Sequence, residues 1–360
     1  MDWAGASVDQ GDERTARSVC ALLFGRPLYD AVLLMVLAAA SIEFAVLRIR
    51  YGFEDHDATF VRLIAGTAPT PFQYRMLIPL ASRGLIALGA LAHVHVPPKA
   101  LFAASDAIFT FATFITALVT LKTLRLSPPQ ILAALLALGV IVDTNYFATE
   151  TLNLLHVYDL PAVFFAFLAT NLLLRRKLGW FYVLLPIALL NRETAVFLCL
   201  MFLLTQWGRM PLPVLVGHMA AQGVMVLAIK AAVLAAFRHN PGAGALSFYT
   251  TDFDPAGAAA HRLHDLRVLE NLKVFITLRR LLHMSSIFGF LWVPYLFALK
   301  RLQDPFFKAT AWVFPPFFAL MLVVGNIDEF RIYSELIPPL FFTVTLGCAR
   351  WMGSGVCPGS

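Results

Sequence analysis

The amino-acid sequence predicts an all-α membrane protein, a polytopic bundle of about ten transmembrane helices. Apolar residues make up 59% of the 360 positions, and charged residues only 14%. The mean hydropathy is +0.74. The apolar residues collect in runs of about 17 to 25, the length that crosses roughly 30 Å of hydrocarbon as an α-helix. A transmembrane β-barrel would instead alternate apolar and polar residues over segments of about ten.

The apolar runs give the expected spans. They cover residues 28–47, 101–121, 129–147, 159–174, 179–190, 194–207, 212–236, 281–299, 309–325 and 333–349. Basic residues in the short connections, such as those at 175–177, place both termini in the cytoplasm by the positive-inside rule. Residues 1–27 then form a cytoplasmic segment, residues 28–350 a single transmembrane domain, and residues 351–360 a cytoplasmic tail.

Two features interrupt this pattern. Residues 76–94 are apolar but contain Pro79 and Arg83, and leucines recur there at about helical spacing. This favours an interfacial helix lying along the membrane surface in the first external loop. The runs 179–190 and 194–207 are short for full crossings and are typical of a broken pair, which membrane proteins tolerate beside other protein or a wet cavity.

Two long external segments, residues 48–75 and 237–280, follow from this topology. Loops of that length are often functional. Most of the 22 acidic residues fall outside the predicted cytoplasmic segments, and ionisable groups at membrane depth usually face a cavity or a site. We therefore expect the function on the external face.

The densest acidic group follows the first expected span and consists of Glu54, Asp55, His56 and Asp57. Carboxylates this close repel one another, which raises the pKa of at least one of them and suits a proton acceptor, unless a cation lies among them. A metal site and a solvated turn between two helices are the alternatives. The loop ends at Tyr74 and Arg75, where the planar guanidinium can bind a phosphate or reach the lipid headgroups.

Further charged residues lie at the external ends of later apolar runs. They are Asp159, Arg192, Glu193, Glu329, Arg331 and Glu335. Asp159 stands before Pro161 at the start of a run, so helix capping alone could explain it. The economical alternative for the others is an internal salt-bridge network. A polar cavity shared with the first loop is the simplest common cause of all these charges.

The sequence contains no cofactor motif. It has no Walker loop, no GxGxxG turn and no GxSxG elbow, so soluble nucleotide donors and hydrolase chemistry lack support. His261 and His264 lie three apart, but without an HExxH frame we interpret them as surface histidines. We expect no cofactor, and a divalent cation stays open although no motif supports one. The net charge of +6 fits loops facing anionic lipid rather than nucleic acid.

In layout, the whole chain resembles the GT-C superfamily of integral membrane glycosyltransferases. Members carry an acid in a first external loop, then a surface helix and many spans. Asp57 matches the acid, and the run from Gln73 to Pro79 is similar to the YRxLxP run of bacterial members. Residues 191–194 and 329–333 are also similar to runs in such proteins.

The resemblance implies a GT-C-like fold and a sugar donor carried on a polyprenyl phosphate, with transfer on the non-cytoplasmic face. Asp57 would be the general base, with Asp55 as its competitor, and Glu54 and His56 as neighbours that tune it. Larger members have a soluble external domain that this chain lacks, so an unidentified glycan or lipid acceptor would be recognised by residues 237–280 or by lipid.

The resemblance also implies three candidates to hold the donor phosphate, which are Arg75, Arg192 and Arg331. Negative charge grows on the leaving phosphate as the glycosidic bond breaks, so a fixed cation there favours the transition state.

Two other functions stay open. A transporter or lipid flippase would also need intramembrane charges, but it should show internal repeats and charges near the midplane, whereas the charges here lie toward one face. A non-catalytic membrane scaffold would keep the fold without the chemistry. Alanine-rich spans and the absence of an N-x-S/T sequon are compatible with a bacterial inner membrane, the active face being periplasmic or extracellular.

Overall fold

The structure, a computed structural model, describes residues 27–55, 58–147, 154–241, 268–325, 327 and 329–351. Its α-helices are α2 (Pro27–Tyr51), α3 (Phe60–Ala65), α4 (Leu77–Leu91), α5 (Pro98–Thr123), α6 (Pro128–Tyr146), α7 (Asp159–Leu174), α8 (Leu178–Asn191), α9 (Phe197–Gln206), α10 (Leu212–Ala236), α11 (Val268–Ile276), α12 (Leu278–Ser285), α13 (Trp292–Arg301), α14 (Pro305–Ala311), α15 (Phe314–Val324) and α16 (Ile337–Trp351). Short 3-10 helices and two-residue strands complete it, namely η1 (Phe72–Tyr74), η2 (Glu193–Val196), η4 (Ile287–Phe290), η5 (Phe330–Leu336), β1 (Phe53–Glu54) and β2 (Leu154–Leu155). The predicted all-α class is confirmed.

Among the described residues, six helical segments are long and apolar enough to cross a membrane. They are Pro27–Tyr51, Pro98–Thr123, Pro128–Tyr146, Leu212–Ala236, Pro305–Val323 and Phe330–Arg350. Shorter apolar helices accompany them, namely α4, α7, α8 and the η2–α9 pair. The short helices fall below the roughly 20 residues that cross a full bilayer, and the total of about ten spans stays a prediction.

The sequence encodes the starts of several helices locally. Proline occupies the first turn of α5, α6 and α14, where its missing N–H is not needed. Ser127 and Gln130 form a capping box before α6, in which the Ser127 N–H donates to Gln130 Oε1 over 2.9 Å. Asp304 Oδ1 accepts the N–H of Phe306 over 2.8 Å at the start of α14.

The span expected over residues 281–299 is not one helix. The chain there forms α12, η4 and α13, and three successive residues around Gly289 have positive φ. The break packs against α6: a Cβ on Gly289 would come within 2.7 Å of the Val140 side chain, and the Phe288 N–H donates to Asn145 Oδ1 over 3.0 Å. Glycine is required because this close approach leaves no room for a side chain.

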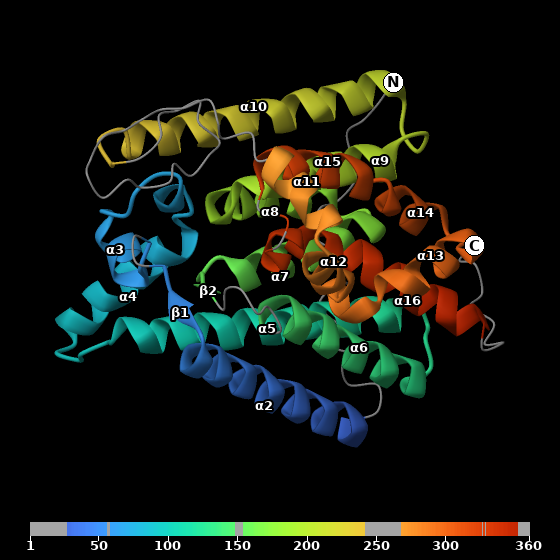
Figure 1. Cartoon of the computed structure of the whole chain (residues 1–360), viewed down its shortest axis with the longest axis horizontal. Helices are drawn as coiled ribbons and strands as arrows, with labels where there is room; N and C mark the ends of the chain where they lie inside the picture. The colour runs from blue at the N-terminus through green and yellow to red at the C-terminus, as the bar shows by residue number, and fades with distance from the viewer. Residues whose placement is uncertain are drawn as a thin grey trace, which may run out of the picture.

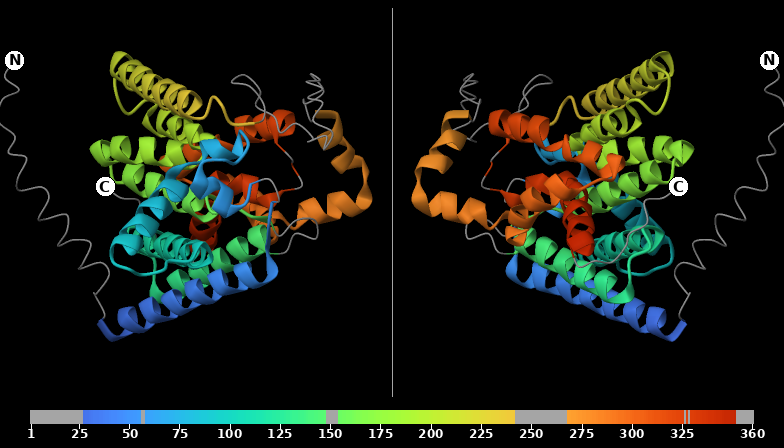
Figure 2. Two further views of the ribbon diagram at one scale, coloured as in Figure 1. Left: turned by 90° about the vertical axis from the view of Figure 1, so that its left-hand side faces the viewer. Right: turned by 90° about the vertical axis from the view of Figure 1, so that its right-hand side faces the viewer.

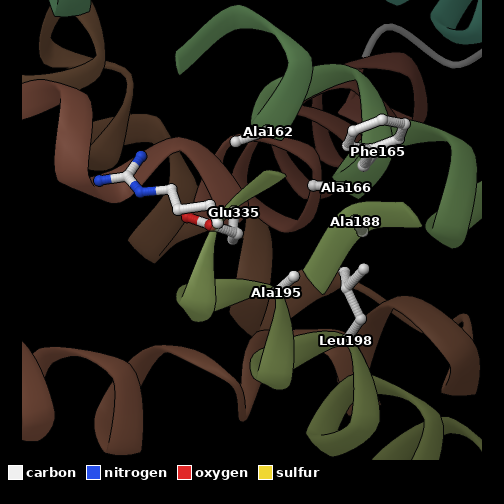
Figure 3. Close-up of a pocket in the computed structure, with 8 residues that line it drawn as sticks. Ala162, Phe165, Ala166, Ala188, Ala195, Leu198 and Glu335 are labelled. Carbon is white, nitrogen blue, oxygen red and sulfur yellow. The ribbon is translucent and has the colours of Figure 1, made fainter. Parts of the chain in front are cut away.

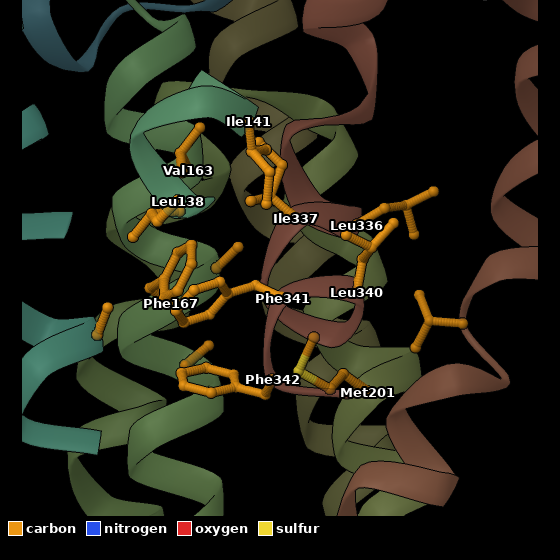
Figure 4. Packing of buried hydrophobic residues seen from close by; sticks show 14 of the residues in the cluster. Leu138, Ile141, Val163, Phe167, Met201, Leu336, Ile337, Leu340, Phe341 and Phe342 are labelled. Carbon is orange, nitrogen blue, oxygen red and sulfur yellow. The ribbon is translucent and has the colours of Figure 1, made fainter. Parts of the chain in front are cut away.

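The centre of the bundle is apolar and aromatic (Figure 4). Phe167 on α7 contacts Phe341 and Phe342 on α16, with ring centroids 5.6 Å apart in both pairs. Figure 4 also places Leu138 of α6 beside Phe167, and Ile141 of α6 beside Ile337 of α16. Helices α7 and α16 are therefore enclosed by other helices, whereas α10 is mostly exposed and lies on the opposite flank from α11 and α12 (Figure 2).

The elements of the predicted first external loop gather at one end of the bundle (Figure 1). Helix α2 continues to Tyr51, so the loop predicted to begin at residue 48 begins later, and Arg48 is a buried helical residue. After it, β1 pairs in parallel with β2. Gly52 permits this approach, since a Cβ there would lie 2.5 Å from the Leu155 side chain. The segment predicted to be an interfacial helix is helical, as α4, and its position at the membrane surface stays a prediction.

Side-chain amides hold the rest of this loop. Gln73 accepts the Ala68 N–H over 3.1 Å and donates to the Leu63 carbonyl over 3.2 Å. Asn240, beyond the end of α10, donates to the carbonyls of Gly66 and Ala68 over 2.9 and 2.8 Å. The second predicted external loop, residues 237–280, contains α11 and the start of α12, and its residues 242–267, with His261 and His264, lie outside the described residues.

Candidate functional site

Charged side chains from five separate segments meet at the end of the bundle that carries the first loop. They come from α2, α5, α7, the junction of α8 and η2, and η5, and they are Arg48, Asp106, Asp159, Arg192 and Arg331. These helices run in both directions through the bundle, so only the folded arrangement brings their charged ends together (Figure 1).

The innermost charges form what we call the inner cluster, which consists of Arg48, Asp106, Asp159 and Arg192. Arg48 Nη1 lies 2.7 Å from Asp106 Oδ2, a direct charge-assisted hydrogen bond. Arg48 Nη2 and Arg192 Nη1 lie 3.9 and 3.7 Å from the two oxygens of Asp159. All four side chains are buried, so each charge depends on its partners rather than on water.

Arg331 joins the inner cluster to the surface. Its Nη1 lies 3.9 Å from Asp159 Oδ2, and its Nη2 lies 2.6 Å from Glu329 Oε2. The side chain is 12% exposed, against 1% for Asp159. An anion arriving from outside would therefore meet Arg331 before it met Arg192 or Arg48.

A chain of hydrogen bonds holds the backbone of Arg331. Ser334 Oγ donates to the Arg331 carbonyl over 2.6 Å. The Tyr146 hydroxyl lies 2.7 Å from Ser334 Oγ and donates to it, because the Ser334 proton is already used. Arg48 lies over the ring of Tyr146, 5.3 Å from its centroid. The Arg331 carbonyl is thus held by Ser334, which Tyr146 of α6 supports. It also accepts a hydrogen bond from Arg192 Nη1 over 3.2 Å.

The second group of side chains, which we call the outer rim, consists of four charged residues and one aromatic ring: Arg75, Glu193, Lys230, Glu329 and Tyr74. Arg75 donates to the Tyr158 hydroxyl and lies 3.5 Å from Glu193 Oε2. Burial alone lowers the pKa of Arg75, but Tyr158 and Glu193 together raise it above its ordinary value. This guanidinium therefore stays charged at every physiological pH.

Lys230 completes the rim from the peripheral helix α10. Its Nζ lies 3.7 Å from Glu193 Oε1 and 4.6 Å from the centroid of the Tyr74 ring. Glu193 is thus shared between Arg75, at the end of the first loop, and Lys230 on α10. The rim residues are more exposed than the inner cluster, Lys230 being 33% and Glu193 36% exposed.

The first-loop acids reach this site through the paired strands. Glu54 of β1 pairs with Leu155 of β2, and the chain then runs on to Tyr158 and Asp159. Asp55 follows directly, and its carboxylate acts electrostatically on Arg331. His56 and Asp57, the predicted base, lie outside the described residues. The described part of the acidic group therefore lies within electrostatic range of Arg331.

A small cavity of about 10 Å³ adjoins the site (Figure 3), with room for about one water molecule. Four alanines from α7, α8 and η2 line it, together with Arg192 and Glu335. Glu335 is buried, and its Oε1 accepts a hydrogen bond from the Thr194 hydroxyl. Its Oε2 has no hydrogen-bond partner among the described residues.

The structure brings together most of the residues predicted from the sequence. The described ones that meet at this end of the bundle are Tyr74, Arg75, Asp159, Arg192, Glu193, Glu329, Arg331 and Glu335. The capping interpretation of Asp159 is wrong, because Tyr158 is the N-cap of α7 and no side-chain cap hydrogen bond forms. Of the expected salt bridges, Arg331 pairs with Glu329, whereas Arg192 pairs with Asp159 instead of a glutamate.

Sequence reasoning missed other members of the site. Asp106 and Lys230 lie inside apolar runs, and that position is itself a signal, because charges within spans usually face a site or a partner. Arg48 was assigned to a loop. Tyr146 and Ser334 carry no charge, so no sequence signal separates them from other polar residues near helix ends.

Among the described residues, no group of three or more His, Cys, Asp or Glu side chains is placed to hold a metal ion. The arginines are instead the groups suited to a ligand, since guanidinium forks match phosphate oxygens. Comparison with protein-family models, with curated proteins and with solved structures finds no match. The function is therefore inferred from the chemistry of the site.

Proposed function

We propose that this protein is a GT-C-type membrane glycosyltransferase that moves a sugar from a polyprenyl-phosphate donor to a glycan or lipid acceptor. Transfer would take place on the non-cytoplasmic face of a bacterial inner membrane. The observation that supports this best is that Arg75, Arg192 and Arg331 meet at the end of the bundle that carries the first-loop acids. An acid beside a fixed cation is what such a transfer needs, one to take a proton and the other to receive the leaving charge.

The proposed reaction uses the first-loop acid as a general base. The carboxylate of Asp57, or of its competitor Asp55, takes the proton of the acceptor hydroxyl as its oxygen attacks the anomeric carbon. The bond between that carbon and the phosphate oxygen breaks, and the polyprenyl phosphate leaves with the electron pair. The sugar is then bound to the acceptor, and the carboxyl carries the proton.

The arginines would hold the phosphate during this step. Arg331 is 12% and Arg75 19% exposed, so both lie near enough to the surface to meet a lipid headgroup. Arg192 lies deeper beside Asp159. Their bidentate donors stabilise the charge that develops on the leaving phosphate in a site with little water.

The proposal is tested by transfer from labelled polyprenyl-phosphate sugars, with purified protein in lipid nanodiscs. We expect either Asp57→Asn or Asp55→Asn to reduce turnover by about 100-fold or more. Arg331→Gln should cost about 100-fold, because it removes a donor to the developing charge. Asp143→Asn and Arg238→Gln change exposed residues of the same types and should stay within about twofold of wild type.

Full activity in both aspartate variants would exclude the first loop as the source of the base. Failure of every lipid-linked sugar to turn over, with the protein folded, would instead favour a transporter or a scaffold. A flippase would then move the lipid across the nanodisc or vesicle bilayer without cleaving it.

A further inference from the structure

Asp159 lies among three guanidinium groups without forming a hydrogen bond to any of them. Arg48, Arg192 and Arg331 approach its oxygens to 3.9, 3.7 and 3.9 Å. Direct hydrogen bonds between such groups measure about 2.7 to 2.9 Å. The same cluster forms direct bonds elsewhere, at 2.7 Å for Arg48 with Asp106, so the longer separations are particular to Asp159.

The arginines also have unused donors. Arg192 Nε and Arg331 Nη1 are buried and have no hydrogen-bond partner among the described residues, and both oxygens of Asp159 are in the same state. Unpartnered buried polar atoms are rare in folded proteins. Arg331 Nη1 thus lies opposite an unpartnered oxygen of Asp159, at 3.9 Å and beyond hydrogen-bond distance.

A phosphate group matches these donors better than a carboxylate does. It has more acceptor oxygens and carries up to two negative charges near neutral pH. Arg331 is the most exposed of the three arginines around Asp159, so a phosphate that enters from the surface reaches Arg331 first. Glu329, the other partner of Arg331, is 19% exposed. Its side chain can rotate into solvent when a phosphate binds Arg331.

We infer that Asp159 is a resident counter-anion of these arginines, and that the phosphate of a bound ligand replaces it at Arg331 and Arg192. The inference rests on the proposed function for the lipid origin of that phosphate. In the unoccupied site, Asp159 holds the arginines against their mutual repulsion. In the occupied site, the negative charge of Asp159 lowers the affinity of the arginines for phosphate, which favours release of the polyprenyl-phosphate product.

The test measures the Kd of inorganic phosphate and of farnesyl phosphate for the full chain in nanodiscs. Asp159→Asn removes the competing charge and should tighten phosphate binding by about tenfold. Asp159→Glu lengthens the side chain by about 1.5 Å, which brings the carboxylate into direct contact with the guanidinium groups and should weaken binding. If Asp159 only positioned the arginines, both substitutions would weaken it.

Asp30→Asn is the matched control, because it removes an equally buried carboxylate that pairs with Lys122 outside the site. It should change the Kd by less than about threefold. Weaker or unchanged binding in Asp159→Asn would overturn the inference. If that variant does not fold, unchanged or tighter binding in Asp159→Glu would overturn it.

The two proposals fail in different ways. If Asp159→Asn binds phosphate more tightly but the wild-type protein transfers no sugar, the counter-anion role of Asp159 is supported and the glycosyltransferase proposal is contradicted. If the wild-type protein transfers sugar but the Asp159 variants bind phosphate with an unchanged Kd, the glycosyltransferase proposal is supported and the counter-anion role is contradicted. Farnesyl phosphate should bind more tightly than inorganic phosphate if the ligand is a prenyl lipid, and equal affinities would point to a free phosphate.

Discussion

The inner cluster and the outer rim contain the same kinds of ion pair in different surroundings. In the inner cluster, Arg48 and Asp106 are 2% and 0% exposed, whereas Lys230 and Glu193 in the rim are 33% and 36% exposed. Burial makes each lost partner expensive, while exposed pairs exchange readily with water and salt. The inner cluster therefore sets the shape of the site, and the rim is where a ligand can exchange contacts.

The largest effect on stability is expected from Arg48→Met. The substitution leaves the carboxylate of Asp106 buried without its cation, which should lower the free energy of unfolding by about 3 to 5 kcal/mol. Titration with a denaturing detergent in mixed micelles measures this. The double variant Arg48→Met/Asp106→Leu should recover most of the loss, because an apolar pair needs no partner charges. No recovery would mean that the inner cluster does not act mainly as a set of pairs.

A smaller effect is expected from Tyr146→Phe. Tyr146 contacts Arg48 of the inner cluster and, through Ser334, holds Arg331. The substitution removes the hydrogen bond to Ser334, the residue that binds the Arg331 carbonyl. The free energy of unfolding should fall by about 1 kcal/mol, and kcat/KM for sugar transfer should fall as well because Arg331 is less firmly placed. Tyr51→Phe alters an exposed tyrosine and should change neither quantity. Equal effects of the two substitutions would show that Tyr146 does not position Arg331.

The smallest effect is expected from Lys230→Met in the rim. Glu193 keeps its contact with Arg75, and the lost pair is largely solvated, so the free energy of unfolding should change by less than about 1 kcal/mol. Lys300→Met, an exposed lysine on α13, is the matched control. A loss above about 2 kcal/mol, with no such loss in the control, would show that this pair anchors α10 and that the rim behaves like the inner cluster.

The sequence predicts the helices better than it predicts their contacts. Long apolar runs, first-turn prolines and the capping box at Ser127 act within a few residues, so α2, α5, α6 and α10 are readable from the chain. The break at Gly289 was not foreseen, because the residues that it packs against, Val140 and Asn145, lie on another helix. A glycine in an apolar run has no local feature that reveals such a neighbour.

In the candidate site, too, the sequence points to some residues and not to the partners that they contact. Arg75, Arg192 and Arg331 stand out in the sequence because charges between apolar runs need an explanation. Their partners do not stand out: Asp159 resembled a helix cap, and Arg48 was placed in a loop. The base proposed at Asp57 stays a prediction, since that residue lies outside the described part of the chain.

By itself, the sequence determined that this protein is an α-helical membrane protein with most of its acidic residues on one predicted face. Apolar run length and charge position are properties of short segments, and the bilayer imposes them directly. Only the tertiary structure decided that Asp159 lies among Arg48, Arg192 and Arg331. Ion pairs between distant segments depend on how helix ends meet, and that is a result of packing across the whole bundle.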